Sequence, residues 1–254
     1  MANAVALPRF AFIKAWEWWV GAAPHPVVGA DTFWFNDTAQ ASLEAKVNAL
    51  LDKAGVAEGG VPTRKFRRAL TVLARPEREV SAWVAQTDTS ETGGILVAVA
   101  GRDAVRVVRD ETMVIVDEVR PDGLFDALID ALPDVPAAQI PDLTIPASRY
   151  EQPRDESYEF GMQTRHTQPD PAGTVRELLD APRTGLHQMY VGIGGRGGRI
   201  RSNPITALDL EQGRVLTFLG SGDNRHEPTL NCIPGGRGDL VEILEATHKI
   251  LAEG

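Results

Sequence analysis

The sequence predicts an α/β protein of the α+β type, in which a strand–strand–strand–strand–helix unit occurs twice and contributes to a central antiparallel β-sheet. Three observations predict it. The spacing of apolar residues changes from a helical period to a strand period and back, twice. Turns rich in glycine and aspartate separate the apolar runs, and several are short enough for hairpins. The second half also repeats the order and length of the elements of the first, at low residue identity.

The composition is that of a globular chain with ample material for a core. Of the 254 residues, 43% are apolar and 24% charged, and the formal net charge is −9. This acidic balance disfavours nucleic acid and anionic membranes as partners, because binding phosphates needs a dense basic face. The single cysteine, Cys232, excludes an intramolecular disulfide, and we expect it to be a small buried hydrophobe.

No targeting or membrane segment is expected. The N-terminus lacks the basic start, apolar stretch and cleavage site of a signal peptide. No apolar run reaches the roughly 18–20 residues of a membrane span. We therefore expect a cytoplasmic protein, in which the glycosylation string Asn36-Asp37-Thr38 and the adhesion tripeptide Arg237-Gly238-Asp239 have no role.

The first expected helix is short and carries three tryptophans. Apolar side chains recur at three- and four-residue spacing over residues 12–20, and the helix should end at Gly21. Trp16, Trp18 and Trp19 could form a binding patch. Indoles that anchor a helix to a core are the commoner case, so we expect a core helix.

Two more helices are expected before the first strand. One covers residues 38–53 and stops near Gly55, because glycine readily takes the left-handed conformation that closes helices. The next begins after Thr63, a good N-cap, and ends before Pro76. Each carries an apolar stripe along one face, which gives it one side for the core.

Eight strands are expected, four in each half. They are residues 79–86, 94–100, 104–109 and 112–119, then 185–193, 204–210, 214–219 and 229–233. An amphipathic helix follows each group, the first after Gly123 and the second after an N-cap at Asp239. A further helix over residues 174–180 precedes the second group and is stopped by Pro182.

We expect one domain over residues 1–254, in three parts. Residues 1–132 hold the N-terminal helices and the first unit, residues 133–172 a proline-rich and partly mobile crossover, and residues 173–254 the second unit. One four-stranded sheet with a single helix leaves edges and a face uncovered. Two units related by a pseudo-twofold axis can join their sheets, and the resulting saddle would suit an elongated protein partner.

Residues 192–197 fit the G-x-G-x-x-G string of dinucleotide-binding proteins but not its structural context. That motif needs a helix next, and the residues up to Pro204 cannot open one. We expect a long flexible hairpin loop instead. Its arginines, Arg196, Arg199 and Arg201, form a basic cluster in an acidic chain and could contribute to a partner-binding surface.

No residue pattern predicts catalysis, a metal ion or a cofactor. The histidines lack metal-ligand spacing, and neither C-x-x-C nor G-x-S-x-G occurs. An enzyme would need paired titratable groups in a cleft, for instance around His187 or His226. A small-ligand regulatory domain would need a deep pocket with convergent polar groups. Both alternatives stay open, and we favour a protein that binds other proteins.

A series of short motifs carries a resemblance over nearly the whole chain. In order they are Trp16-Glu17-Trp18-Trp19, Gly21 with Pro24 and Pro26, residues 49–55, residues 70–76, residues 199–202, Ala207-Leu208-Asp209, Gly213-Arg214-Val215 and Ile233-Pro234-Gly235. Their order and spacing resemble the EspG family, the ESX (type VII) secretion-associated proteins of actinobacteria. The chain departs from the family pattern at residues 229–233, where a tryptophan is commonly expected and none is present.

The resemblance implies a fold and a function. The fold is a quasi-twofold α/β body with a central antiparallel sheet and flanking helical bundles. The function is that of a cytosolic chaperone, without a cofactor, which binds the apolar tip of the PPE chain in a PE–PPE heterodimer and keeps it soluble for export. We expect one copy of each chain in the complex, and a monomer or weak homodimer otherwise.

The contact is expected on the sheet face and helices of the second unit, beside the arginine-bearing loop. The candidate contact residues are Tyr190, Arg196, Arg199, Arg201, Leu208, Leu216 and Phe218. Apolar anchors would supply affinity and rim charges the choice of substrate.

Overall fold

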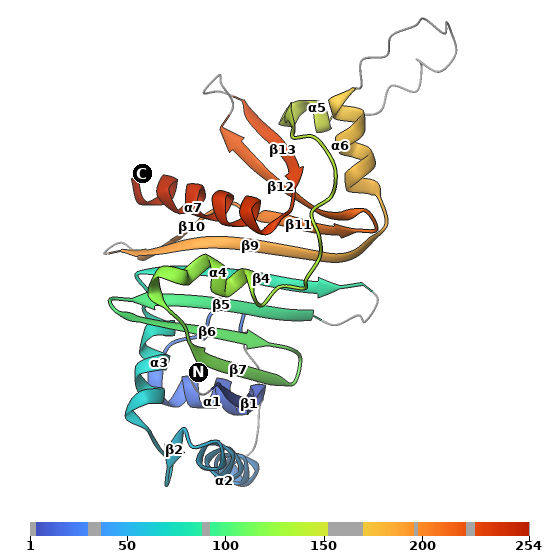
Figure 1. Cartoon of the computed structure of the whole chain (residues 1–254). Coiled ribbons are helices and arrows are strands. Elements are labelled where there is room, and N and C mark those ends of the chain that lie inside the picture. Colours follow the sequence, from blue (N-terminus) through green and yellow to red (C-terminus); the bar gives the residue numbers. More distant parts are fainter. Residues whose placement is uncertain are drawn as a thin grey trace, which may run out of the picture.

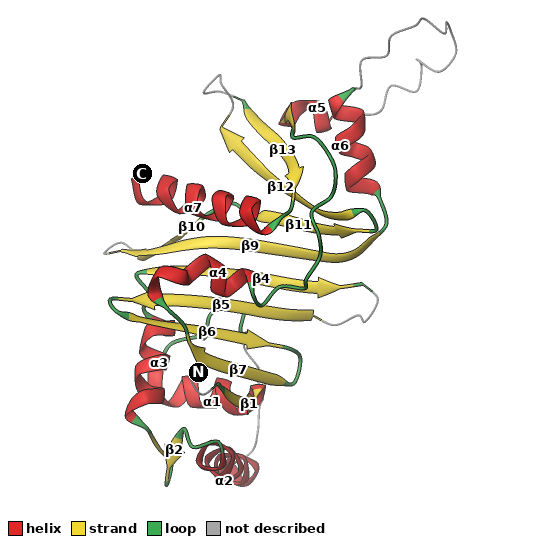
Figure 2. Cartoon of the chain, in the orientation of Figure 1, coloured by secondary structure: helices red, strands yellow, loops and turns green. Residues whose placement is uncertain are grey.

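The computed structural model of the chain describes residues 4–29, 37–87, 92–151, 170–195, 198–221 and 227–253. These residues form a mixed α/β protein with one eleven-stranded antiparallel sheet, a separate two-stranded sheet and seven α-helices (Figures 1 and 2). The helices are α1 (Arg9–Val20), α2 (Asp37–Lys53), α3 (Arg64–Ala74), α4 (Leu124–Ile129), α5 (Ala147–Glu151), α6 (Pro171–Asp180) and α7 (Arg237–Glu253).

The strands of the large sheet are β1 (Val5–Pro8), β4 (Arg78–Gln86), β5 (Thr92–Ala100), β6 (Asp103–Arg109), β7 (Met113–Glu118), β8 (Leu143–Pro146), β9 (Arg183–Gly195), β10 (Gly198–Arg201), β11 (Ile205–Leu210), β12 (Gly213–Ser221) and β13 (Pro228–Pro234). The small sheet is β2 (Ala57–Glu58) with β3 (Val61–Pro62).

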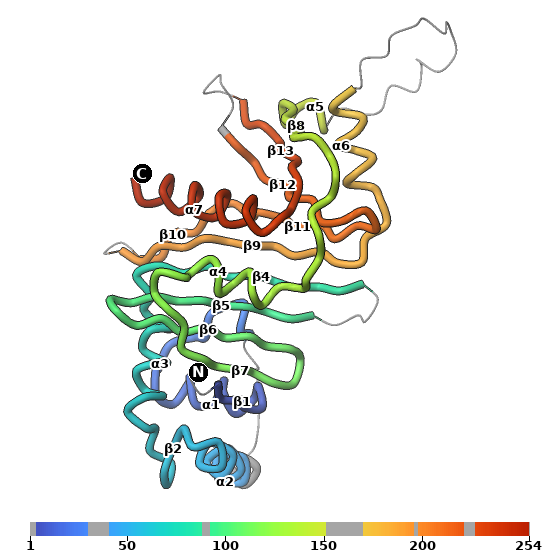
Figure 3. The backbone as a smooth tube through the Cα atoms, in the orientation of Figure 1, coloured from blue at the N-terminus to red at the C-terminus, as the bar shows by residue number. Residues whose placement is uncertain are grey.

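The large sheet is continuous from one half of the sequence to the other. Its strand order is β1-β7-β6-β5-β4-β9-β11-β12-β13-β8, and β10 pairs with the far end of β9. Strands β4 and β9 pair antiparallel at the centre, from Arg78 opposite Ile193 to Gln86 opposite Gly185. Strands β5, β6 and β7 follow outward from β4, and β11, β12 and β13 follow outward from β9 (Figure 3).

The eight strands predicted from the sequence are all present. Each begins and ends within two residues of its predicted first and last residue. The expected helices are present as well. Thr63 is the N-cap of α3, because its Oγ1 accepts a hydrogen bond from the Phe66 N–H at 3.2 Å. The prediction of an N-cap at Asp239 is wrong. Helix α7 begins at Arg237, and the Asp239 carboxylate reaches back to accept a hydrogen bond from the Gly236 N–H at 2.9 Å.

Three strands of the large sheet were not predicted. Strands β1, β8 and β10 have four residues each, and β1 and β8 both end in proline, which lacks the N–H that strands use. The expected loop over residues 192–201 is wrong for the described residues, because β9 continues to Gly195 and β10 pairs with it. Arg196 and Gly197 lie outside the described residues.

The proline-rich crossover holds more structure than expected, since it contains β8 and α5. The chain after α4 crosses the sheet and is fixed to β12, where the Arg214 N–H donates to the Pro136 carbonyl at 2.7 Å and the Ala138 N–H donates to the Arg214 carbonyl at 2.9 Å. Strand β8 then pairs with β13 at the edge. Residues 152–169 of the crossover lie outside the described residues, so its expected partial mobility stays a prediction.

Helices cover the two faces of the sheet unevenly. We call the face under α4 and α7 the front face, and Figure 1 shows both helices lying across it. The back face is covered by α1 and α3 in the first half and by α6 in the second, each over its own apolar cluster. The centre of the back face, on β4 and β9, lies between these two groups of helices.

Helix α1 is a core helix, as expected. Trp16 is 1% exposed, and its Nε1–H donates to the Ala22 carbonyl at 2.9 Å. Trp19 meets Phe66 edge to face at 5.9 Å between ring centroids. The helix ends at Gly21, whose φ of 70° is the left-handed conformation that glycine adopts without strain.

Cys232 is fully buried in the cluster beneath α6, as the sequence predicted. Burial raises the pKa of its thiol to about 11, because the thiolate would lose its hydration. Among the described residues, no helix is long and apolar enough to cross a membrane.

The Cys232 thiol should therefore be inert in the native protein. At pH 8 we expect no reaction with an aromatic disulfide reagent until a denaturant unfolds the chain, and then release of one equivalent, since Cys232 is the single cysteine. The measurement is absorbance of the released thiolate with and without denaturant. Full reaction of the native protein would contradict the placement of β13 in the core.

Candidate partner-binding surface

The centre of the back face carries an aromatic and basic surface. We call Trp83, Gln188, Tyr190, Arg199 and Arg201 the central patch. Trp83 lies opposite Gln188 in the pairing of β4 with β9, and Tyr190 is two residues further along β9, so all three side chains share this face. Trp83 is 37% exposed. Strand β10 adds the two arginines, because Arg201 lies opposite Gly192 and Arg199 opposite Gly194.

Arginines stack on both aromatic rings of the patch. The Arg201 guanidinium lies 4.1 Å from the centroid of the Tyr190 ring. The Arg109 guanidinium lies 5.4 Å from the Trp83 ring, and its Nε–H donates to the Val27 carbonyl at 2.7 Å. Cation–π contacts of this kind are attractive and hold each arginine against its ring. The two aromatic rings and their arginines therefore form one packed surface.

A buried carboxylate lies under the edge of the patch. Glu79 on β4 is 2% exposed, and its Oε1 lies 3.3 Å from Arg199 Nε and 3.6 Å from His25 Nε2. His25 Nδ1 accepts a hydrogen bond from the Val27 N–H, so Nε2 carries the proton that faces Glu79. The second oxygen, Glu79 Oε2, is buried and has no hydrogen-bond partner among the residues that the structure describes. Arg199 thereby ties the β9–β10 hairpin to the centre of the sheet.

The glycines of the G-x-G-x-x-G string make room for this arrangement. A β-carbon on Gly192 would come within 2.8 Å of the Glu79 side chain, and one on Gly194 would collide with the Pro76 carbonyl oxygen. No helix follows the string, since β10 does. The string therefore serves close packing of strands rather than a phosphate group, as its context in the sequence indicated.

The structure brings together only part of the predicted contact set. Tyr190, Arg199 and Arg201 lie side by side on the central patch. Leu208 is 2% exposed beneath α6, so it belongs to the core of the back face. Leu216 is fully buried on the front face, where Phe218 packs half-buried against the same cluster. Arg196 lies outside the described residues.

Trp83 was missed in the sequence, although its signal was present. It lies in a strand whose alternate residues Val80, Ala82 and Val84 pack on the front face. Strand alternation therefore puts Trp83 on the opposite face, and only the position of the covering helices determines whether that face is open. The helices of the back face lie on either side of Trp83, which leaves it accessible.

The charged cluster around His187 is sealed inside the protein. His187 is fully buried, and its Nε2 lies 2.8 Å from Asp209 Oδ2. Arg214 donates to the same carboxylate from Nε at 2.6 Å and from a terminal nitrogen at 2.9 Å. Arg214 also donates to the Pro133 carbonyl, so the cluster anchors the crossover chain. A substrate cannot reach this pair, and His226 lies outside the described residues.

Burial alone would raise the pKa of Asp209, but hydrogen bonds from Arg214 and His187 outweigh it and lower the pKa from 3.8 to about 2. The carboxylate is therefore ionised in the native state at any physiological pH. Its role is to compensate the buried Arg214 guanidinium, which would otherwise lack a counter-charge.

The structure is that of an α/β protein with an aromatic and arginine-bearing patch at the centre of its large sheet. In a comparison with protein families, the model of the EspG family, ESX-1 EspG, matches residues 11–246. The chain belongs to the EspG family, and the resemblance seen in its motifs is confirmed. This is a family of ESX secretion chaperones and not of enzymes. No curated protein matches the chain at a significant level.

Asp209→Asn should destabilise the protein by about 3 kcal/mol at neutral pH, because it leaves Arg214 buried without a counter-charge. The lowered pKa adds a dependence on pH. The ionised Asp209 side chain contributes fully to the free energy of unfolding above about pH 4, and this contribution is lost as the pH falls towards 2. Urea unfolding of the wild type and of the Asp209→Asn variant measures this dependence. The difference between their free energies of unfolding should be smaller at pH 3 than at pH 7. Asp122→Asn, at an exposed site, is the control and should change neither value.

Glu79→Gln should loosen the β9–β10 hairpin, because it removes the charge that holds Arg199. We expect amide exchange of residues 198–201 to rise about tenfold, the effect of losing one ion pair to a buried carboxylate. Hydrogen–deuterium exchange with mass spectrometry measures it. Arg199→Gln should have the same effect, and the double variant should add nothing further. Glu111→Gln is the charge-matched control, and equal exchange in all variants would show that the contact does not order the hairpin.

Proposed function

We propose that this protein is a cytoplasmic chaperone of ESX (type VII) secretion that binds a PE–PPE heterodimer at the apolar tip of the PPE chain. It keeps the heterodimer soluble until export. The observation that carries the proposal is the central patch: an open, aromatic and arginine-bearing sheet face in a chain of the EspG family. Tyr190, Arg199 and Arg201 remain proposed contacts, and Trp83 joins them.

The chemistry of the patch suits an apolar helical tip. Exposed apolar side chains at such a tip would self-associate, so covering them reversibly keeps the substrate soluble. Trp, Tyr and Arg are the residues that most often dominate binding energy at interfaces. Trp83 and Tyr190 would act as anchors, and the arginines at the rim would select among substrates by charge. A standard interface would cover about 800 Å² on each partner.

We further propose that the chain is a single domain, residues 1–254, formed by internal duplication. In this account residues 1–132 and 173–254 carry the two units and residues 133–172 connect them. The order of strands outward from β4 and outward from β9 supports the proposal, because it runs through three sequential strands on each side. On this proposal the central patch, which lies where β4 pairs with β9, would be beside the pseudo-twofold axis, and the helices on either side would be the flanking bundles.

Co-expression with PE–PPE pairs from the same genome tests the proposed function. Size-exclusion chromatography with light scattering should show a stable complex with one copy of each chain. A charged residue placed in the apolar tip of the PPE chain should abolish it. If no pair co-elutes, including the pair encoded nearest, the chaperone proposal fails.

Trp83→Ala should weaken the complex by thirtyfold or more, since truncating an aromatic anchor at the centre of an interface costs about 2 kcal/mol or more. Trp18→Ala is the matched control, because Trp18 has the same 37% exposure but lies on α1 away from the patch. Biolayer interferometry with the purified heterodimer measures both dissociation constants. Equal weakening by the two variants would place the interface elsewhere.

A further inference from the structure

A cavity of about 510 Å³ opens in the first half of the molecule, between β1, β6, β7 and the start of α3. Its volume lies within the range of small-molecule sites, about 300–1,000 Å³. It lies under the first half of the back face and does not include any residue of the central patch. Any ligand that it holds would therefore act separately from the partner surface.

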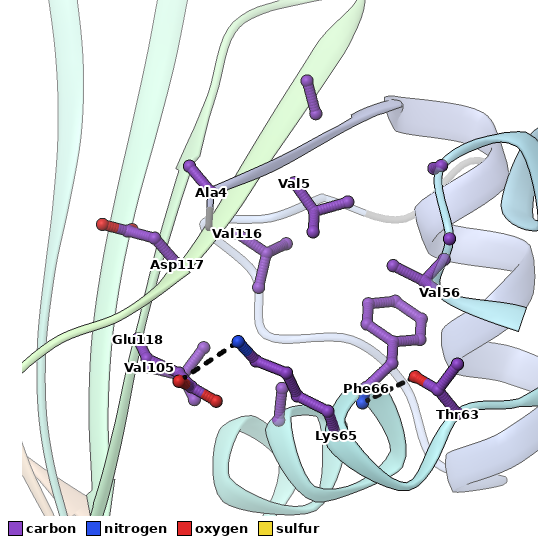
Figure 4. Close-up of a pocket in the computed structure, with 14 residues that line it drawn as sticks. Ala4, Val5, Val56, Thr63, Lys65, Phe66, Val105, Val116, Asp117 and Glu118 are labelled. Atoms are coloured by element: carbon purple, nitrogen blue, oxygen red, sulfur yellow. Dashed lines mark hydrogen bonds and ion pairs between the residues drawn. The ribbon is translucent and has the colours of Figure 1, made fainter. Parts of the chain in front are cut away.

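Most of the residues that line the cavity are apolar. They include Val5, Ala54, Val56, Phe66, Ala69, Val105 and Val116. Figure 4 shows Phe66 and Val116 facing the cavity from opposite sides. Val105 is 2% and Phe66 4% exposed, so core residues form the floor of this open cavity. Water gains few hydrogen bonds there, and an aliphatic chain would displace it favourably.

The charged residues that line the cavity, Lys65, Asp117 and Glu118, lie at its mouth. Lys65 on α3 reaches across to Glu118 on β7, with Nζ 3.2 Å from Oε2 (Figure 4). Both side chains are about half exposed, and an ion pair of this kind contributes little to stability. Asp117 also lines the cavity, but Arg106 already pairs with it at 2.8 Å. Lys65 is therefore a cation whose present partner can be exchanged.

The start of α3 is rich in positive charge. Arg64, Lys65, Arg67 and Arg68 occur within its first five positions, and its first turn has no acidic residue. Of the acids nearby, Glu118 pairs with Lys65 and Asp103 with Arg68. Basic residues at a helix N-terminus are unfavourable, because the helix dipole is positive there. The chain as a whole has a net charge of −9, but this helix start is basic. A bound anion would reduce the repulsion between its positive charges and the helix dipole.

We propose that this cavity binds an aliphatic monocarboxylate, with its hydrocarbon chain among the valines and Phe66 and its carboxylate on Lys65. The ligand carboxylate takes the place of Glu118, whose side chain turns out into water. Buried hydrocarbon supplies most of the affinity, and the charge at the mouth selects the head group. An ammonium head group is disfavoured by Lys65 and by the helix start, and a neutral head group gains neither interaction.

Three probes with the same tail test the head-group selection on the full-length protein. Decanoate, decanol and decylamine are titrated by isothermal calorimetry below their aggregation limits. We expect decanoate to bind at least tenfold more tightly than decanol, and decylamine not to bind. Equal binding of all three probes would show an unspecific apolar cavity and overturn the proposal. Absence of binding by all three would show that the cavity holds no such ligand.

Variants at the mouth locate the site without disturbing the core. Lys65→Gln should lower the affinity for decanoate about tenfold, because one charge-assisted contact is lost. Glu118→Gln should raise the affinity, because it removes the competing carboxylate. Arg102→Gln removes an equal charge outside the cavity and should leave affinity unchanged. Ala69→Leu should block the tail, with circular dichroism to confirm folding. Equal affinities for the Lys65 and Arg102 variants would refute the assigned head-group position.

Discussion

The pairing of β4 with β9 is the interaction on which the rest of the molecule depends. Nine residue pairs run from Arg78 opposite Ile193 to Gln86 opposite Gly185, and they join the two halves of the chain in one sheet. The helices that the structure describes have 5 to 17 residues and cover the faces of this sheet only in part. Among them, α4 and α7 cover the centre of the front face, and none covers the centre of the back face, where Trp83 is 37% exposed. The proposed binding surface follows from this uneven covering.

Two ion-pair clusters, each built on a buried carboxylate, hold the parts that the sheet alone does not fix. Asp209 and Arg214 anchor the crossover chain against the front face, and Glu79 with Arg199 anchors the β9–β10 hairpin against the back face. Burying charges is unfavourable unless each has a partner, so each cluster strongly favours one position of its segment. In this way a sheet with long connections presents a single surface, with Arg201 held over Tyr190 rather than free in solution.

Much of the fold was predictable because half-buried strands alternate apolar and polar residues and helices carry an apolar stripe along one face. All eight predicted strands and the N-cap at Thr63 are present. The short strands β1, β8 and β10 were not, since pairing with a neighbouring strand, not their own composition, makes them strands. The same limit applies to the site. Of the proposed contact residues, Tyr190 and Arg201 lie on the central patch, whereas Leu208 and Leu216 are core residues; Trp83, which also lies on the patch, was not predicted. Only the packing of distant helices determines which strand residues remain accessible.

The most direct test of this account is hydroxyl-radical footprinting of the protein, alone and with a bound PE–PPE heterodimer. Trp83 and Trp18 are equally exposed, so their oxidation in the free protein should be similar. In the complex, oxidation of Trp83 and Tyr190 should fall several-fold while that of Trp18 stays the same. Protection confined to α4 and α7, with Trp83 still oxidised, would show that the front face binds the substrate and would contradict the account.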